Sequence, residues 1–366
     1  MKFRVNRETL LKPLQVAGGV VERRQTLPIL SNVLLRVSGD TLTMTGTDLE
    51  VELTATARIS DGEAGEITVP ARKLIDICRT LPEGADIEVK VEDGKALVRS
   101  GRSRFTLATL PANDFPATDG VSGGFEFTLR QDQLKELIER TQFCMANQDV
   151  RYYLNGMLLE VDREVVRAVA TDGHRLAYSQ IGVDVGVSVK HQVIVPRKGV
   201  GELGRLLGDK EDPVEVRMNG NHIRLSFGGM VMTSKLIDGR FPDYERVIPR
   251  QSSREVIADR EMLRQALARA AILSNEKYRG VRIELSDGRL RALVSNPEQE
   301  EAEEEVEVEY RGDVFEIGFN VGYVLEALNA VREDKVRIGL TDANSSCLLH
   351  GVENTSTRYV IMPMRL

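Results

Sequence analysis

Residues 171–177, TDGHRLA, place an acid, an imidazole and a guanidinium almost side by side, as Asp172, His174 and Arg175. Together with the hydroxyl of Thr171, these are residue types that can perform general acid–base chemistry. Such a site also needs a nucleophile with a positioned base, and nothing in the sequence supplies one near this stretch. Whether His174 is the general base of an enzyme therefore depends on the elements that hold it.

Two further stretches match catalytic or cofactor motifs. GVSGG (120–124) fits the G-x-S-x-G nucleophile elbow, but that elbow needs a strand before it and a helix after it. Here a proline-containing loop precedes the motif and the strand-like FEFTL follows it, which disfavours a hydrolase. GVGELG (199–204) fits the dinucleotide fingerprint after a strand-like segment. Because corresponding segments of the chain lack these glycines and the surroundings resemble antiparallel hairpins, a dinucleotide-binding enzyme is only the second choice.

Composition narrows the class of protein. The chain has 366 residues, which suggests two to three domains. Its cysteines, Cys78, Cys144 and Cys347, are odd in number and never form a CxxC pair, so we expect reduced thiols in the cytoplasm and no zinc site. The four histidines are scattered, the N-terminus is charged throughout, and no run of about 18 apolar residues occurs. We therefore expect no metal, no cofactor, no signal peptide and no membrane span.

Three copies of one unit follow each other along the chain. The first corresponding segments are LTMTGTDLEVEL (42–53), RAVATDGHRLAYS (167–179) and LRALVSNPEQEEAEE (290–304). The second are ITVPARKLIDICRTL (67–81), VIVPRKGVGELGRLL (193–207) and EIGFNVGYVLEALNAV (316–331). A repeat of this kind usually marks a repeated supersecondary unit, and two such chains would bring six units together.

Each copy has the pattern of an α+β domain with two helices and two small antiparallel sheets. Apolar residues at helical spacing open the copies at 7–17, 130–142 and 260–271, and a second helix is predicted at 70–81, 196–207 and 320–330. Pro13 should kink the first helix or shift its start. Asp93-Gly94, Asn219-Gly220 and Asp287-Gly288 favour hairpin turns. Gly- and Ser-rich segments then divide the chain into domains 1–120, 121–250 and 251–366.

Charge is distributed unevenly between helices and the rest. Counted over 6–18, 70–81, 130–142, 196–207, 259–271 and 320–330, the six helical segments carry a net +5 while the chain carries −7, which leaves −12 for everything else. A basic set of helices is an electrostatic footprint for phosphate. Twelve helices from two chains, packed at about 10 Å and with a radius of about 5 Å, would enclose an opening of roughly 28 Å. A B-form duplex fits through such an opening.

Two other features have both a plain and a functional interpretation. The glutamates of 298–309 form either a solvated strand face or a partner surface for the basic stretch RSGRSRFTL (99–107), which would join two chains head to tail. Tyr152-Tyr153 could pack on a strand or stack on bases. The sequence pattern alone leaves both alternatives open.

Several long motifs together resemble one family. They are LPILSNVLL (27–35), TDLE, TDGHRLA, VPRKG, SKLIDGRFPDY, AAILSNEKYRGV, NPEQEEAEE and the terminal YVIMPMRL. Over essentially its whole length the chain closely resembles the bacterial sliding clamps, the beta subunits of DNA polymerase III, in a proteobacterial form. The resemblance implies a DNA clamp fold, a ring-shaped homodimer around double-stranded DNA without sequence preference, and no enzymatic activity. It implies as partners the replicative DNA polymerase, the ATP-driven clamp loader, and other DNA polymerases and repair proteins.

The same resemblance implies site residues. DNA-contacting positions match Arg24, Arg72, Gln148, Tyr152 and Tyr153, with Lys198 added on charge and location. Dimer-interface positions match Lys73, Arg102, Arg104, Phe105 and Leu107 on one side and Ile272, Leu273, Glu298, Glu301 and Glu304 on the other. The partner-peptide cleft between domains 2 and 3 matches Leu154, Thr171, Gly173, His174, Arg175, Leu176, Pro242, Arg246, Val247, Val360, Met362, Pro363, Met364, Arg365 and Leu366. Within this cleft we expect His174 and Arg175 to orient a bound peptide through hydrogen bonds.

Overall fold

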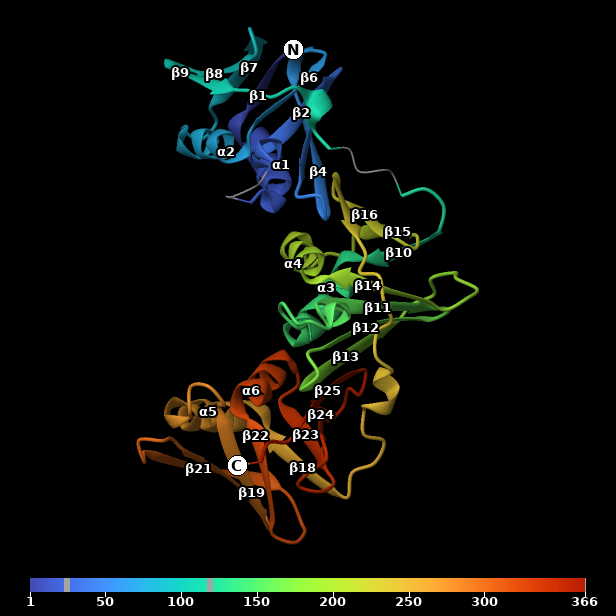
Figure 1. Ribbon diagram of the computed structural model, residues 1–366, viewed down its shortest axis with the longest axis vertical. Coiled ribbons are helices and arrows are strands. Elements are labelled where there is room, and N and C mark those ends of the chain that lie inside the picture. The colour runs from blue at the N-terminus through green and yellow to red at the C-terminus, as the bar shows by residue number, and fades with distance from the viewer. Residues whose placement is uncertain (23–26, 117–120, 366) are drawn as a thin grey trace. The chain divides into compact units, whose positions relative to one another are not determined.

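The computed structural model describes residues 1–22, 27–116 and 121–365 as six α-helices, short 3₁₀ turns and twenty-five strands (Figure 1). The helices are α1 (Arg7–Ala17), α2 (Ala71–Thr80), α3 (Gln131–Thr141), α4 (Arg197–Leu206), α5 (Arg260–Ala270) and α6 (Val321–Ala330). All six predicted helices are confirmed to within one residue at each end. Pro13 lies inside α1 and does not shift its start, because the side chain of Asn6 caps the helix by accepting from the Glu8 N–H.

The strands form three antiparallel sheets. The five-stranded sheet has the order β5 (Ser60–Glu63), β1 (Lys2–Asn6), β7 (Asp86–Glu92), β8 (Lys95–Ser100) and β9 (Ser103–Ala108). The eight-stranded sheet has the order β10 (Phe125–Arg130), β15 (Pro213–Met218), β16 (His222–Phe227), β17 (Met230–Lys235), β4 (Val51–Arg58), β3 (Thr41–Thr47), β2 (Asn32–Ser38) and β6 (Gly65–Pro70). The twelve-stranded sheet has the order β14 (His191–Pro196), β11 (Gly156–Asp162), β12 (Val165–Thr171), β13 (Arg175–Gly182), β25 (Thr357–Ile361), β24 (Cys347–Gly351), β23 (Lys335–Leu340), β18 (Arg254–Asp259), β21 (Glu301–Glu309), β20 (Arg289–Ser295), β19 (Gly280–Ser286) and β22 (Phe315–Asn320).

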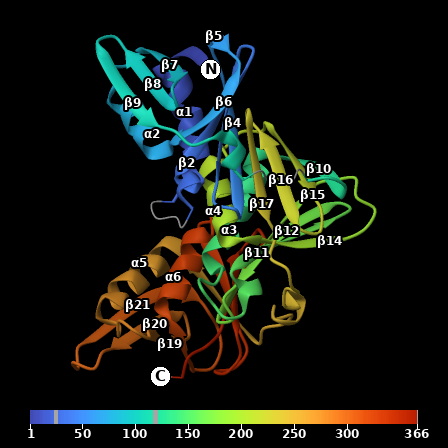
Figure 2. The same ribbon diagram turned by 45° about the horizontal axis from the view of Figure 1, so that its top comes forward.

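Each copy contributes two sets of antiparallel strands, as predicted, but the sheets do not end where the copies end. The last strand of one copy pairs with a strand of the copy before it, as β17 does with β4 (Figure 2) and β25 does with β13. Each pairing joins the sheets of two copies into one. The boundaries at 120 and 250 stay a prediction, because the chain divides compactly into two units, Met1–Asp132 with Gly201–Leu236 and Gln133–Val200 with Ile237–Leu366.

Each unit has an aliphatic core beneath its helices. In the first unit α1 packs on α2 and on strands β3 and β4, around a cluster that includes Phe3, Leu14 and Met44, all fully buried. In the second unit α5 and α6 lie side by side (Figure 1), and α5 covers β20 and β21. These helices leave the opposite faces of the strands for other contacts.

The backbone geometry tests the predicted hairpin turns and the two catalytic or cofactor motifs. Asp93 and Gly94 have φ of +49° and +67°, as a two-residue type I′ hairpin requires. Asn219 instead closes its turn with its side chain, which accepts from the N–H groups of Asn221 and His222. GVGELG lies within α4 and follows an antiparallel strand, so it lacks the turn that a dinucleotide phosphate needs. After GVSGG comes strand β10 and not a helix.

The three cysteines are free and buried, and burial raises the pKa of Cys78 to about 11 and of Cys347 to about 12.

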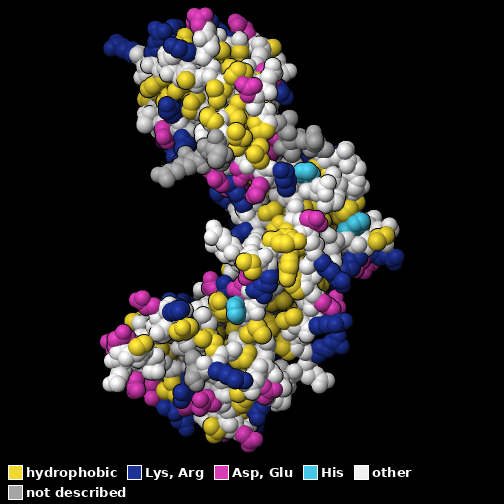
Figure 3. All heavy atoms as spheres, in the orientation of Figure 1, with side chains coloured by type: hydrophobic (Ala, Val, Ile, Leu, Met, Phe, Trp, Pro, Cys, Tyr) yellow, Lys and Arg dark blue, Asp and Glu magenta, His cyan; other side chains and the backbone are white. Residues whose placement is uncertain are grey.

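On the face seen in Figure 3, Lys and Arg side chains alternate with Asp and Glu side chains over the C-terminal part of the chain. Among the described residues, no helix is both long and apolar enough to cross a membrane.

Candidate functional site

A groove of about 250 Å³ opens in the second unit where β13 meets β25. Ten of the residues predicted for the peptide cleft line it: Leu154, Thr171, Gly173, His174, Arg175, Leu176, Pro242, Val247, Val360 and Met362. Leu154, Leu176 and Val360 are buried, and Met362 is half exposed at the end of the floor. A groove with an apolar floor and a few polar groups at its edge is suited to binding another molecule's apolar side chains.

Three residues line the groove that the sequence analysis missed: Arg151, Tyr153 and Tyr244. Arg151 bridges two parts of the rim, since its guanidinium donates to both carboxylate oxygens of Asp149 and to the carbonyl of Asp172. Hydrogen bonds from the Arg151 side chain and backbone lower the pKa of Asp149 to about 2. Tyr153 could have been found from its place beside Leu154, and Tyr244 from its place between Pro242 and Arg246, but Arg151 carries no such signal.

Other predicted cleft residues lie beyond the groove lining. Arg246 is exposed and pairs with Asp243 at 2.8 Å. The N–H of Met364 bonds to the carbonyl of Gly318, which fixes the end of the chain after Pro363. Arg365 is exposed, and Leu366 lies outside the described residues. Their parts in binding stay predictions.

Asp172 closes a turn and does not act as an acid. Its carboxylate accepts from the N–H groups of His174 and Arg175 at 2.9 and 3.1 Å. The hydroxyl of Thr171 accepts from the Gly173 N–H and donates to the Arg175 carbonyl. Gly173 adopts φ of +88°, which glycine allows without strain.

The first copy builds the same turn from TDLE. Asp48 accepts from the N–H groups of Glu50 and Val51, and Thr47 accepts from the Leu49 N–H and donates to the Val51 carbonyl. Leu49 takes φ of +79° where the second copy has glycine. Because the turn forms identically without a histidine or an arginine, the threonine and aspartate of TDGHRLA are structural.

The Arg175 guanidinium is committed to contacts inside the chain. It donates to Asp172 at 3.1 Å, to the Phe143 carbonyl at 2.8 Å and to Glu326, and it lies 4.4 Å from the centre of the Tyr323 ring. These contacts use three of its five N–H donors and fix β13 against α6. Its part in orienting a peptide stays a prediction.

Cys144, the thiol nearest these charges, is 2% exposed, and burial raises its pKa well above the usual range. A buried thiol of this kind is not a nucleophile. The exposed His174 takes part through its backbone, whose carbonyl accepts from the Met362 N–H at 2.9 Å. The residues of TDGHRLA therefore form an edge of the groove.

The groove is specific to the second junction, although the backbone at the first junction is equivalent. Leu176 lies opposite Val360, and at the corresponding positions of the first junction Glu52 lies opposite Thr233. The backbone N–H of Lys235 donates to the Glu50 carbonyl, just as the backbone N–H of Met362 donates to the carbonyl of His174. The repeat thus supplies the scaffold, and three apolar side chains make the floor.

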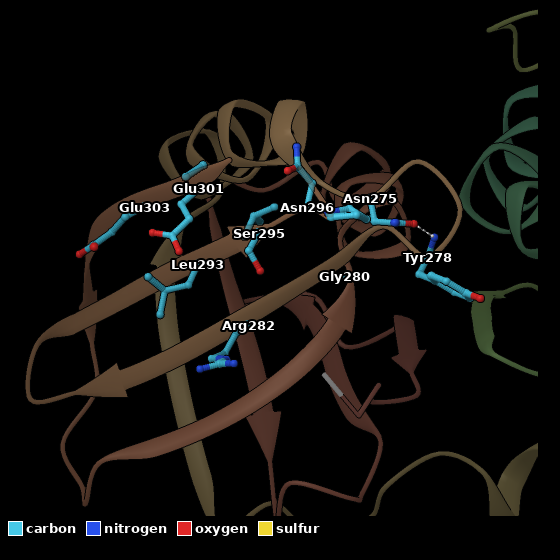
Figure 4. A pocket seen from close by; sticks show the side chains of 12 residues that line it. Asn275, Tyr278, Gly280, Arg282, Leu293, Ser295, Asn296, Glu301 and Glu303 are labelled. Carbon is cyan, nitrogen blue, oxygen red and sulfur yellow. Dashed lines mark hydrogen bonds between the residues drawn. The ribbon is translucent and has the colours of Figure 1, made fainter. Parts of the chain in front are cut away.

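A larger hollow of about 720 Å³ occupies the corresponding place in the third copy (Figure 4). Tyr278, Arg282, Leu293, Ser295, Glu301 and Glu303 are among its lining residues. Its rim carries several charged side chains, whereas the second-copy groove is mainly apolar. No group of three or more His, Cys, Asp or Glu side chains suited to a metal ion occurs in the described part of the chain.

The residues predicted to contact DNA belong to both units. Arg72 is exposed on α2, and Lys198 is half buried on α4. Tyr152 and Tyr153 lie in a 3₁₀ turn and not in a strand, with their rings edge to face at 5.8 Å and Tyr152 57% exposed. Gln148 lies in the preceding loop with φ of +56°. Arg24 lies outside the described residues.

The residues predicted for a dimer interface occupy two strand edges and the helix ends beside them. Arg102 and Arg104 are exposed at β9, Lys73 is exposed on α2, and Phe105 is half buried. Leu107 is 6% exposed and belongs to the core of its own unit, so it supports β9 from beneath. On the other side Ile272 is 77% exposed, Leu273 is half buried, and Glu298 and Glu301 are exposed. Glu304 already pairs with Arg269 at 2.6 Å.

Comparison with known proteins identifies the family. Residues 1–119, 128–243 and 245–365 match the N-terminal, central and C-terminal domains of the DNA polymerase III beta subunit. The beta sliding clamps of Pseudomonas aeruginosa and Escherichia coli K12 are 57% and 55% identical, and both matches cover all of each chain.

Solved structures agree with these matches. The DNA polymerase III subunit beta from Pseudomonas aeruginosa has a TM-score of 0.98 at 56% identity, and one bound to griselimycin has a TM-score of 0.97 at 57% identity. Both cover all of each chain. The chain therefore belongs to the DNA polymerase III beta subunit family, the beta sliding clamps, and has their three-domain fold and their role as a processivity factor that is not an enzyme.

Proposed function

We propose that two copies of this chain close head to tail into a ring around double-stranded DNA. The ring tethers the replicative DNA polymerase, and other DNA polymerases and repair proteins, through short peptides that dock in the groove between β13 and β25. A clamp loader opens it, and it works in the cytoplasm, where bacterial DNA lies. The apolar floor at Leu176, Val360 and Met362 is the observation that carries the docking part of this proposal.

Ring closure is supported by the two strand edges that the repeat leaves without a partner. Strands β4, β13 and β21 follow the same turn in the three copies, and β17, β25 and β9 are the corresponding last strands. Within the chain β4 pairs with β17 and β13 pairs with β25. Strand β9 is the edge of its sheet, and β21 pairs on its second side only from Val308 onward.

The remaining pair would join β21 of one chain to β9 of the next. If this pair keeps the register of the other two junctions, Glu303 lies opposite Arg104 and Glu305 opposite Arg102, so glutamates face arginines. This contact is heterologous, and it closes after two chains if each of the six junctions turns the chain by about 60°. Exposed sheet edges otherwise tend to pair indiscriminately.

DNA contact inside the ring is supported by the basic helices and by Arg24, Arg72, Gln148, Tyr152, Tyr153 and Lys198. The phosphate backbone is the same for every sequence, so arginine and lysine contacts to it confer no sequence preference. Tyr152, with its exposed ring, could also stack on an unpaired base.

The docking proposal is tested with a fluorescent peptide from the clamp-binding segment of the replicative polymerase. Deleting residues 362–366 should abolish binding and leave a folded dimer, because β25 ends at Ile361. Met362→Ala should weaken binding about 5- to 20-fold, since burying a methionine contributes about 1.5–3 kcal/mol and Met362 is already half buried.

Lys235→Ala is the matched control, because Lys235 holds the equivalent position at the first junction. It should leave peptide affinity unchanged. Griselimycin, which a 57% identical clamp binds, should compete with the peptide. Wild-type affinity in the truncated dimer would show that peptides dock elsewhere.

A further inference from the structure

One wall of the groove is a short segment that crosses the strands. Residues Phe241–Val247 supply Pro242, Tyr244 and Val247 to the groove. The N–H groups of Arg246 and Val247 bond to carbonyls within the same segment. Such local bonds shape the segment but do not hold it on the sheet, so side chains must position the wall.

Two aromatic side chains fasten this wall. Phe241 is 8% exposed and Tyr244 is 4% exposed, and both belong to a cluster with Leu158, Val169 and Leu176 of the sheet. The Tyr244 ring also lies 5.8 Å from the ring of Tyr178. Its hydroxyl continues below this apolar layer and donates to Glu160 at 3.1 Å.

The Glu160 side chain is fully buried and binds four partners. Tyr244 and Arg167 donate to one carboxylate oxygen, and Lys190 and Gln192 donate to the other at 2.8 and 2.6 Å. Burial acts to raise the Glu160 pKa, but hydrogen bonds from Lys190, Gln192 and Arg167 outweigh it and keep the pKa below its ordinary value. Glu160 therefore joins three strands and the wall at one buried charge.

The repeat shows that this arrangement belongs to the groove and not to the fold. In the third copy Glu284 lies opposite Arg291, just as Glu160 lies opposite Arg167. That pair is 2.9 Å apart but partly exposed. The first copy has Arg36 at this position, 59% exposed and paired with Glu66.

A buried carboxylate is expensive unless it is fully hydrogen-bonded. Of the three copies, only the second buries a carboxylate at this position, since the first has Arg36 there and Glu284 of the third is partly exposed. In the second copy, the four hydrogen-bond partners of Glu160 offset this cost. The first copy forms the same strands with Arg36 at this position, so a buried carboxylate is not needed here to close the sheet.

We propose that Glu160 is a positioning residue of the groove, which acts through the Tyr244 hydroxyl to hold the Phe241–Val247 wall against the sheet. Its effect on peptide affinity rests on the proposed docking function, whereas its effect on the wall does not. Without the hydroxyl contact the wall moves outward, and Pro242 and Val247 no longer close on a bound side chain.

The test uses full-length dimers carrying Tyr244→Phe, Glu160→Gln or both, with Glu284→Gln as the matched control. Hydrogen–deuterium exchange reports on residues 241–248, and the fluorescent polymerase peptide reports on affinity. Tyr244→Phe keeps the ring in its cluster and removes only the hydroxyl. It should speed exchange in the wall and weaken the peptide roughly 3- to 10-fold, through faster dissociation.

The double variant should be no weaker than the weaker single variant, because both changes break one connection. Glu284→Gln should match wild type in both measurements. Wild-type exchange of the wall in Tyr244→Phe, or additive losses in the double variant, would overturn the proposal. If wild type binds no peptide, the docking function fails, and the exchange measurement still decides whether Glu160 positions the wall.

Discussion

Arg175 shows at the residue scale how chemistry suggested by sequence can be structural. Its neighbours Asp172 and His174 lie within three positions, so the sequence reveals them. Its partners Glu326 and Tyr323 lie about 150 positions away, and no local pattern marks them. The repeat shows that the turn does not depend on catalytic side chains, because TDLE forms the same turn as TDGH without the histidine or the arginine.

Glu160 also gives a prediction for stability against pH. Its pKa lies below the ordinary value in the folded chain, so the folded state favours the carboxylate. This contribution is complete above the unfolded pKa, about 4.3 for glutamate, and is lost as pH falls through the lower folded pKa. The groups that face Glu160 are Arg167, Lys190, Gln192 and Tyr244.

We therefore expect wild type to be more stable than Glu160→Gln at pH 7, and the difference to shrink as pH falls from 5 to 3. Urea unfolding midpoints at these pH values measure it. Glu284→Gln should differ less from wild type at every pH, because Glu284 is partly exposed. A Glu160→Gln difference that stayed constant to pH 3 would mean that the carboxylate charge is not what stabilises the fold.

At the scale of elements, local pattern predicted the helices and the antiparallel strands of each copy, but not the continuation of the sheets from one copy to the next. Helix ends depend on neighbours, such as the Asn320 side chain that accepts from Gly322 and Tyr323, and these are visible in sequence. Sheet continuity depends on pairs such as Val360 with Leu176, which alternation cannot reveal. Leu107 shows a related limit, since burial in a core and burial in an interface favour the same residue type, and its interface role stays a prediction.

The elements β9, β21 and the end of α5 give a prediction about assembly. Exposed ion pairs contribute only about 0–1 kcal/mol each, whereas fully burying a large apolar side chain contributes about 1.5–3 kcal/mol. Ile272 is 77% exposed in the single chain, so it has the most to gain. Ile272→Ala with Leu273→Ala should give monomers, and Arg102→Ala alone should only weaken the dimer.

Sedimentation velocity at several concentrations measures this order. Met262→Ala is the control, because Met262 is 60% exposed on the same helix α5 but lies outside the predicted interface. It should remain dimeric. Monomers from Arg102→Ala together with a stable Ile272→Ala, Leu273→Ala dimer would mean that ion pairs, and not apolar burial, supply most of the stability of the dimer.

At the scale of the whole molecule, a net charge of −7 would normally argue against a DNA-binding protein. An enclosing ring does not need strong phosphate contacts, because topology and not affinity retains it. A few basic side chains facing the duplex suffice to keep it centred, and weak contacts leave it free to slide. The net negative charge of the chain outside its helices then discourages non-specific binding of DNA to the outside of the ring.

This reasoning gives the last prediction, which separates enclosure from ordinary binding. A protein held by six to ten phosphate contacts would lose roughly 10³- to 10⁵-fold in affinity between 50 and 200 mM salt. A closed ring loaded on nicked circular DNA should largely survive that change and leave once the circle is cut. Gel filtration of labelled clamp on circular and linearised DNA, at both salt concentrations, measures the retained fraction. The Ile272→Ala, Leu273→Ala variant should be lost from both forms, because an open chain encloses nothing. Equal retention of wild type on circular and linear DNA would mean that it binds along the duplex and does not encircle it.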